Sequence, residues 1–196
     1  MDAYSFYQRF VEVTDKDRIV DGERLFDIYK SNTDYTKTIT KILNDMVDEA
    51  GYTHQNEYFR IDVIGWVGHA EEMENDPDYE KVDLNPHFWD LKVAIEHENS
   101  KADWSDEVFK LIHIKCPLKV IIGYSPWNQR GEEEEKKLNF IARWMNKVSA
   151  FKNEEEEEYL IILGNAKGKG RGIGDYDSFD YRGYLYNSDL KHFERI

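Results

Sequence analysis

Three carboxylates set in two apolar runs are the residues of this sequence best suited to chemistry. One run ends in Glu96 and Glu98, and the other, residues 58–66, holds Asp62 among β-branched and aromatic residues. Alternate side chains of a β-strand share a face, so Glu96 and Glu98 would lie on one face about 6.6 Å apart along the strand. For any one of these acids, a solvent-facing strand end is the commoner explanation. The three together favour a joint site that binds a cation.

Hard divalent cations such as Mg²⁺, with Mn²⁺ as a substitute, prefer carboxylate oxygens and keep several bound waters. Asp62, Glu96 and Glu98 could supply two or three ligands, and the backbone carbonyl of His97 a further one. Without a metal, the three acids would repel one another. A metal beside a phosphate activates water and stabilises the entering and leaving oxygens of an in-line displacement. The residues therefore favour a magnesium site that could activate a water beside a phosphate.

Two lysines could bring a positive charge to these acids. Lys92 shares the strand face of Glu96 but lies about 13 Å from it along the strand. Lys110, one to two turns into the next expected helix, is the better candidate, with a solvated side chain as the alternative. The side chain of His97 falls on the opposite strand face, where a packed histidine is expected rather than a ligand.

The elements that must position these residues begin with an amphipathic helix between Glu23 and Ala50. Its second half carries the clearer apolar repeat: Ile39, Ile42, Leu43, Met46 and Val47. Residues 31–34 can break the run or cap a new helix, and Gly51 suits a C-terminal cap. Residues 52–68 read as one extended run. Its alternation places these side chains on one face: Tyr58, Arg60, Asp62 and Ile64.

Strand and helix patterns alternate in the second half of the chain. The expected strands cover residues 91–98, 118–124, 159–163 and, last, 181–186, and the expected helices cover residues 104–115 and 132–151. Ser100 or Asp103 can cap the first of these helices, and Pro117 ends it. This order implies right-handed crossovers and helices on both faces of a sheet. We therefore predict an α/β or α+β fold with a mixed central β-sheet flanked by helices.

The length of 196 residues fits one domain. No apolar run is long enough to span a membrane, and the first residues lack the basic and apolar parts of a secretion signal. We therefore expect a cytoplasmic protein without a membrane segment. Cys116 is the single cysteine, which excludes an internal disulfide and a cysteine-rich zinc site. Its apolar flanks suggest a buried thiol.

The net charge of −14 argues against nucleic-acid binding, which depends on Lys and Arg contacts to phosphates. The acids are concentrated in residues 69–90, 132–137 and 153–158, however, and the rest of the chain is neutral. One face could be locally basic, because such fields fade within about 8 Å. Residues 69–88 are expected to form a solvated acidic loop, since their acids enclose no glycine of the kind an EF-hand needs.

A second segment, residues 165–174, alternates glycine with three basic residues: Lys167, Lys169 and Arg171. It does not match a P-loop or a dinucleotide-binding loop. Two interpretations stay open, a flexible connector and a loop that contacts a nucleic-acid backbone.

The order of these parts over residues 25–125 resembles the core of the PD-(D/E)XK nuclease superfamily, the restriction-endonuclease-like fold. Asp62 falls on the family's aspartate and Glu96 on its acidic residue, both ligands of a catalytic magnesium in that family. Glu98 stands at the position of the family's lysine, which is similar to a minority of restriction endonucleases with an Asp and Glu-x-Glu site. Ile61 stands where the family has proline. The family's core usually has one more strand before the aspartate.

The resemblance implies a single nuclease-like domain, with its core at about residues 25–165, that acts on DNA as a magnesium-dependent endonuclease. Asp62, Glu96, Glu98 and Lys110 would be its catalytic residues. A glutamate in place of the lysine favours a metal-ligand or general-base role for Glu98. RNA as substrate and a homodimer stay open. The alternative is an inactive protein of the same fold that binds a basic protein through its acidic surface.

Overall fold

The computed structural model of the protein describes all residues except 30, 82–87, 100–102, 126–130, 152–156 and 166–178. A seven-stranded sheet forms its centre, with strands in the order β3 to β9. Their bounds are β3 Thr53–Tyr58, β4 Ile61–Gly68, β5 Trp89–His97, β6 Leu118–Ser125, β7 Glu158–Asn165, β8 Arg182–Asn187 and β9 His192–Arg195. Strands β5, β6 and β7 are parallel, and the other pairings are antiparallel. The predicted mixed sheet is confirmed.

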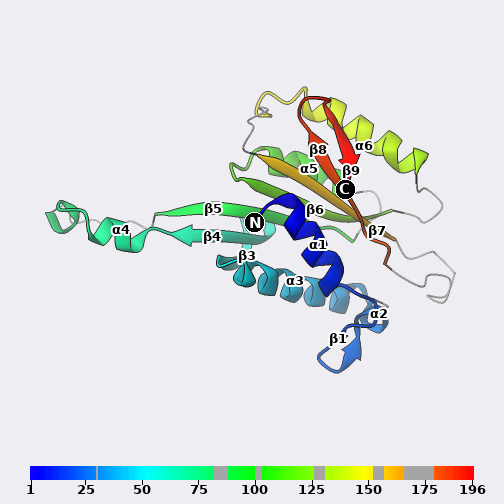
Figure 1. Ribbon diagram of the computed structural model, residues 1–196, viewed down its shortest axis with the longest axis horizontal. Coiled ribbons are helices and arrows are strands. Elements are labelled where there is room, and N and C mark those ends of the chain that lie inside the picture. Colours follow the sequence, from blue (N-terminus) through cyan, green and yellow to red (C-terminus); the bar gives the residue numbers. More distant parts are fainter. Residues whose placement is uncertain (30, 82–87, 100–102, 126–130, 152–156, 166–178) are drawn as a thin grey trace.

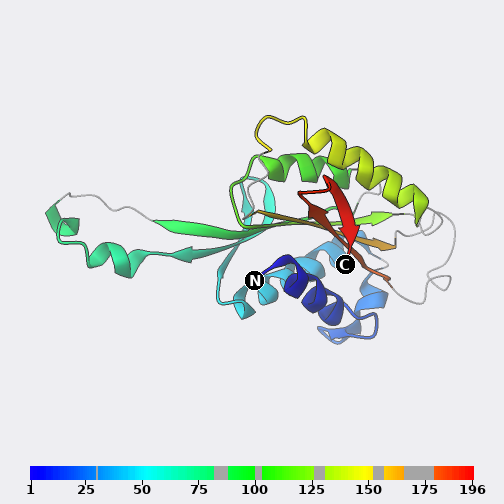
Figure 2. The ribbon, with the colours of Figure 1, turned by 45° about the horizontal axis from the view of Figure 1, so that its top comes forward.

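Helices cover both faces of this sheet, as expected (Figures 1 and 2). One face carries α1 Ala3–Val13, α2 Leu25–Ile28 and α3 Asn32–Glu49, and the other carries α5 Trp104–Ile112 and α6 Glu132–Met145. Helices α5 and α6 are the crossovers that join the three parallel strands. A hydrophobic core lies on each side, and successive residues of β5 enter different cores, Ile95 on the α3 side and Ala94 on the α5 side.

Helix α3 forms as its sequence predicts. The Ser31 hydroxyl accepts a hydrogen bond from the Asp34 N–H at its start, and Gly51 follows its end with a φ of 79°, in the left-handed region that glycine favours. All five residues of the predicted apolar repeat are buried. The first half of the predicted helix is only partly helical: it begins with β2 Glu23–Arg24, which pairs with β1 Ile19–Val20, and continues as the short α2. The run then breaks, and Ser31 caps a new helix, as residues 31–34 allowed.

The run 52–68 is a hairpin rather than one strand. Phe59 and Arg60 have φ values of 49° and 65°, and a two-residue turn with positive φ at both positions reverses the chain between β3 and β4. The prediction that Tyr58, Arg60 and Asp62 share a strand face was therefore wrong for the residues before Ile61. The sequence concealed the turn, since Phe-Arg replaces the Asn-Gly or Asp-Gly such turns usually carry.

Several other bounds differ from the predicted ones. Helix α5 ends at Ile112 and α6 at Met145, each earlier than expected, and β9 follows the strand that was expected to be last. In the β8–β9 turn, the Asn187 side chain accepts hydrogen bonds from the N–H groups of Asp189 and Leu190. Helix α1 was not predicted. Its Asp2 cap accepts a hydrogen bond from the Ser5 N–H at 2.7 Å.

Strands β4 and β5 extend beyond the rest of the sheet into a long projection, here called the acidic arm (residues 69–90; Figures 1 and 2). The expected acidic loop holds, in its described part, the short helix α4 Ala70–Glu74 and a 3₁₀ turn at Tyr79–Lys81. Such short helical pieces give no readable periodicity. His69 ties the arm together, since its ring nitrogens lie 2.9 Å from Glu72 and 3.0 Å from Asp90. Among the described helices, none is long and apolar enough to cross a membrane.

Candidate functional site

The structure places Asp62 and Glu96 beside each other on neighbouring strands. Strands β4 and β5 pair so that Val63 lies opposite Ile95, and the next pair in this register is Asp62 with Glu96. Directly opposite residues of an antiparallel pair share a face. That face is the one under α5, where Ala94 also packs. The predicted proximity of the two acids therefore follows from strand register.

Helix α5 contributes a positive charge to this pair of acids through the side chain of Lys110. Lys110 Nζ lies 2.6 Å from Glu96 Oε1, also contacts Glu107 one turn earlier on the helix, and donates a hydrogen bond to the Arg60 carbonyl at 2.9 Å. Asp62 Oδ2 accepts the backbone N–H of His97 at 2.7 Å. Lys110, named from the sequence as a candidate cation, is thus part of this cluster.

Burial sets the charge state of the cluster. Glu96 is only 2% exposed, and burial raises its pKa to about 8, with Lys110 opposing the shift and the Asp62 charge adding to it. Burial also raises the pKa of Asp62, against the His97 N–H and Lys110. Burial alone would lower the pKa of Lys110, but Glu107 and Glu96 outweigh it and raise that pKa. Three acids thus share one ammonium group.

Glu98 does not complete a three-carboxylate cluster with Asp62 and Glu96. Strand β5 ends at His97, and the N–H of Glu98 donates to the Ile122 carbonyl of β6 at 2.9 Å. The alternation that would align Glu98 with Glu96 ends with the strand. Within the described ranges, no group of three or more His, Cys, Asp or Glu side chains is placed to hold a metal ion.

The oxygen atoms of Asp62 and Glu96 are of the chemical type that binds magnesium. Asp62 and Glu96 offer hard carboxylate oxygens on one face, and Glu96 Oε1 and Glu107 Oε2 are buried against the Lys110 ammonium group. The set offers two side-chain carboxylates on the strands, to which the His97 carbonyl could add a third oxygen.

The His97 side chain lies on the α3 side, as expected for a packed histidine. It is 6% exposed, and its Nε2 lies 2.9 Å from the Tyr124 hydroxyl. Burial lowers its pKa to about 3, so the ring stays neutral. Tyr124 belongs to a buried group of hydroxyls with Tyr35 and Tyr181. Cys116 is buried as expected, and burial raises its pKa to about 12.

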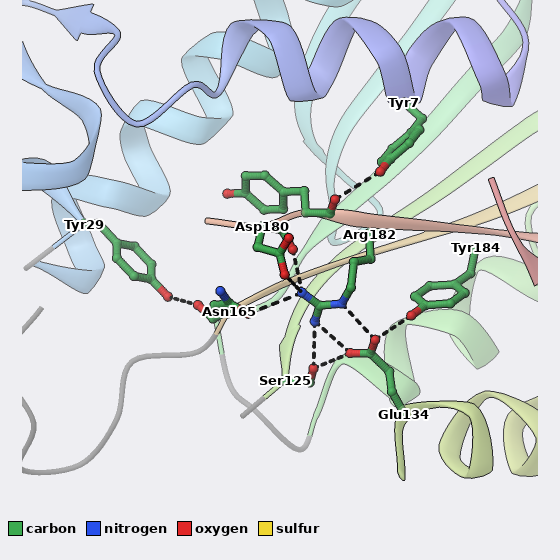
Figure 3. A network of polar contacts seen from close by, with 9 residues as sticks. Tyr7, Tyr29, Ser125, Glu134, Asn165, Asp180, Arg182 and Tyr184 are labelled. Carbon is green, nitrogen blue, oxygen red and sulfur yellow. Dashed lines mark hydrogen bonds and ion pairs between the residues drawn. The ribbon is translucent and has the colours of Figure 1, made fainter. Parts of the chain in front are cut away.

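The sequence analysis missed a second buried polar network, around Arg182 of β8 (Figure 3). Its guanidinium donates to Glu134 of α6 through Nε at 2.9 Å and Nη2 at 2.8 Å, and also to Ser125 and Asn165 at the ends of β6 and β7. Burial would raise the pKa of Glu134, but Arg182, Ser125 and the Tyr184 hydroxyl outweigh it and lower that pKa. The available signal was helical spacing, since Glu134 stands four residues before the buried Leu138.

A third buried charge lies at the opposite end of the parallel strands. Lys119 of β6 is fully buried, pairs with Glu157, and donates to the Tyr159 hydroxyl at 2.8 Å. Its Nζ also lies 4.4 Å from the centre of the Tyr159 ring. The glycine-rich basic segment, of which residues 166–174 follow β7, lies outside the described residues.

No protein-family model matches this chain, and no curated protein or solved structure matches it either. A functional assignment therefore depends on the geometry of the chain itself.

Proposed function

We propose that the protein is a magnesium-dependent, endonuclease-like phosphodiesterase that acts on DNA, with Asp62 and Glu96 at its catalytic centre. One observation carries the proposal: the two carboxylates share one face of neighbouring strands, and the Lys110 ammonium contacts Glu96 there. Carboxylates with a lysine are suited to hold a hard cation and to neutralise a phosphate.

The order of the elements supports the same proposal. Helix α3, strands β3, β4 and β5, helix α5 and strand β6 follow one another along the chain. This is the order expected from the resemblance to the PD-(D/E)XK nucleases, including the additional strand before the one that carries the aspartate. Asp62 stands near the start of β4 and Glu96 near the end of β5.

Each residue has a distinct role in the proposed reaction. Magnesium, when held by Asp62, Glu96 and the His97 carbonyl, supplies the charge that lowers the pKa of a water and stabilises the leaving oxygen. The His97 N–H fixes the Asp62 carboxylate. Lys110 brings a positive charge to the phosphate. Glu98, one residue past β5, is the proposed general base that takes the proton of the attacking water.

The test is cleavage of single-stranded DNA, duplex DNA and RNA with Mg²⁺ or Mn²⁺. We expect the wild type to cut DNA and Asp62→Asn to lose at least about 100-fold in rate, because it loses a charged ligand. Asn keeps the shape and an acceptor for the His97 N–H. The matched control is Asp45→Asn, an exposed aspartate on α3, which should cut like the wild type.

A metal chelator should abolish cleavage, and Mg²⁺ should raise the melting temperature of the wild type more than that of Glu96→Gln. Equal shifts in both would assign metal binding to the acidic arm instead. If no nucleic acid is bound or cut with either metal over a range of salt, the proposal is wrong.

In that case the second candidate takes its place, an inactive protein of this fold that binds a basic protein. The observation that favours it is the projection of the acidic arm away from the sheet (Figure 1). The arm carries eight acids and one lysine.

A further inference from the structure

A pocket of about 640 Å³ opens between the β3–β4 turn, the start of β5 and the segment that follows α5. It includes Tyr58 and Phe59 of the turn and Trp89 of β5. Lys110 connects it to the carboxylates, because its Nζ contacts both Glu96 and the carbonyl of Arg60, the residue after Phe59. The pocket and the candidate site therefore share the β3–β4 turn, although the pocket itself is lined by other residues than Asp62, Glu96 and Lys110.

Aromatic rings form a continuous series along this pocket. The ring centres of Phe59 and Tyr58 lie 4.6 Å apart, those of Tyr58 and Trp89 5.4 Å, and those of Trp89 and Trp66 5.9 Å. Phe59 closes the series toward solvent and is 78% exposed. An exposed ring at the end of a packed aromatic series offers a free face for another flat ring.

The turn holds Phe59 in an unfavourable backbone conformation. Its φ of 49° and that of Arg60, 65°, lie in the left-handed region that bulky side chains rarely adopt. Glycine or asparagine would relieve this strain, yet the sequence presents an aromatic ring and a guanidinium there. Local strain of this kind is concentrated at functional sites, where the rest of the fold holds it in place.

The charges at the pocket suit a phosphate backbone. Glu157 at its wall is neutralised by the fully buried Lys119. Lys92 and Asp90 also line the pocket and form an ion pair at 3.2 Å, so the positive charge in excess comes from Lys115, which lines the pocket, and from Arg60, which is exposed at the turn. In a chain with a net charge of −14, this balance is locally favourable to an anion.

We propose that this pocket binds an unpaired nucleobase, so that the substrate is single-stranded DNA or a single-stranded region. The inference rests on the proposed function and adds its substrate class. In a duplex, the base faces are covered by their neighbours, whereas an unpaired base can stack on an aromatic side chain. Phe59 would stack on the base, and Arg60 and Lys92 would contact the flanking phosphates.

The test measures binding of labelled single-stranded and hairpin-duplex DNA in the presence of a chelator, so that no cleavage is needed. We expect the wild type to prefer the single strand, and Phe59→Ala to weaken single-strand binding by about 5- to 100-fold, the range for loss of one stacked base. The matched control is Phe140→Ala, another exposed aromatic, on α6 and 51% exposed. It should change single-strand binding by less than about 2-fold, as expected for an ordinary surface substitution.

Both substituted rings are exposed, so both variants should keep the wild-type melting temperature. The inference is overturned if the wild type binds duplex as well as single strand, or if the two alanine variants bind alike. The same experiments distinguish failure of the pocket inference from failure of the proposed nuclease function. Single-strand binding that depends on Phe59 without any cleavage would remove the nuclease proposal and leave the pocket, and cleavage with no dependence on Phe59 would do the reverse.

Discussion

His97 joins the two faces of the sheet. Its backbone N–H holds the Asp62 carboxylate on the α5 side, while its ring lies against Tyr124 and Tyr35 on the α3 side. The ring is buried against the Tyr35 and Tyr124 rings, and no residue that the structure describes forms a hydrogen bond with its Nδ1. A charged imidazole there would lack a counter-ion, so the position of the Asp62 carboxylate depends on a histidine that must stay neutral.

The lowered pKa of His97 predicts acid sensitivity. Its pKa is about 3 in the folded protein and near 6.5 in the unfolded chain. Between these values the unfolded chain binds the extra proton, so the free energy of unfolding falls as pH falls below 6.5, by up to about 1.4 kcal/mol per pH unit. His97→Gln should flatten this dependence, measured by urea unfolding at several pH values between 4 and 7.

The matched control for this experiment is His113→Gln, an exposed histidine after α5. It should keep the wild-type pH dependence. Parallel pH curves for the wild type and His97→Gln would contradict the account of a buried neutral ring.

The Arg182 network fastens α6 to the sheet. Glu134 of α6 is fully buried and Arg182 of β8 is 3% exposed, so neither charge is solvated in the folded protein. Hydrogen bonds from Ser125 and Tyr184 to the carboxylate offset part of the desolvation penalty. Breaking one half of such a pair leaves a buried charge uncompensated.

Removal of Arg182 should therefore destabilise the fold strongly. We expect Arg182→Met to lower the free energy of unfolding by about 3–5 kcal/mol, and the double variant with Glu134→Gln to recover part of that loss. Lys136→Met, which breaks an exposed ion pair with Glu133 on the same helix, should cost less than about 1 kcal/mol. A double variant less stable than Arg182→Met would contradict the buried-charge account. Urea unfolding measures all three.

The sequence predicted those elements whose apolar spacing is regular over several turns or along a buried strand. Helices α3, α5 and α6 and strands β5 to β7 were found this way. Helix α1 had the same signal, since its buried residues Ala3, Phe6, Phe10 and Val13 follow helical spacing. The turn at Phe59 could not be read, because its residues disfavour the conformation that the fold imposes on them.

The candidate site was partly predictable for the same reason. Alternation and strand pairing are enough to put Asp62 and Glu96 on one face. The contact of Lys110 with Glu96 depends on how α5 lies over the sheet, and the position of Glu98 depends on where β5 ends. Neither is encoded in local spacing. The pocket at Phe59 combines four segments distant in sequence and gave no local pattern.

The acidic arm projects from the sheet (Figure 2) and carries eight acids and one lysine, a net charge of −7 out of −14 for the chain. The described arm residues contribute none of the buried core residues. Gly68 and Trp89 are paired at its base, so a two-residue turn could join them directly. The arm is therefore expected to be separable from the folding of the sheet.

Replacement of residues 69–88 by Asn-Gly tests this expectation. It removes seven acids and one lysine and changes the net charge from −14 to −8. The melting temperature should change by less than about 5 °C, because none of the removed side chains that the structure describes is buried. Oligonucleotide binding should tighten at low salt, because fewer acids repel the phosphates. A much larger drop in melting temperature would show that the arm stabilises the sheet.

Strand order in this protein has a consequence for synthesis. Strands β3 to β9 lie in the sheet in the order in which they leave the ribosome, so each can pair as soon as it emerges. Helix α1 cannot dock in this way, because the Ala3 N–H donates to Glu158, 155 residues later, and the Tyr7 hydroxyl to the Tyr181 carbonyl. At usual translation rates, roughly 10–30 s pass between the synthesis of Phe6 and Phe10 and that of the strands against which they pack. Helix α1, which is made before every strand of the sheet, is thus among the last parts of this fold to be buried.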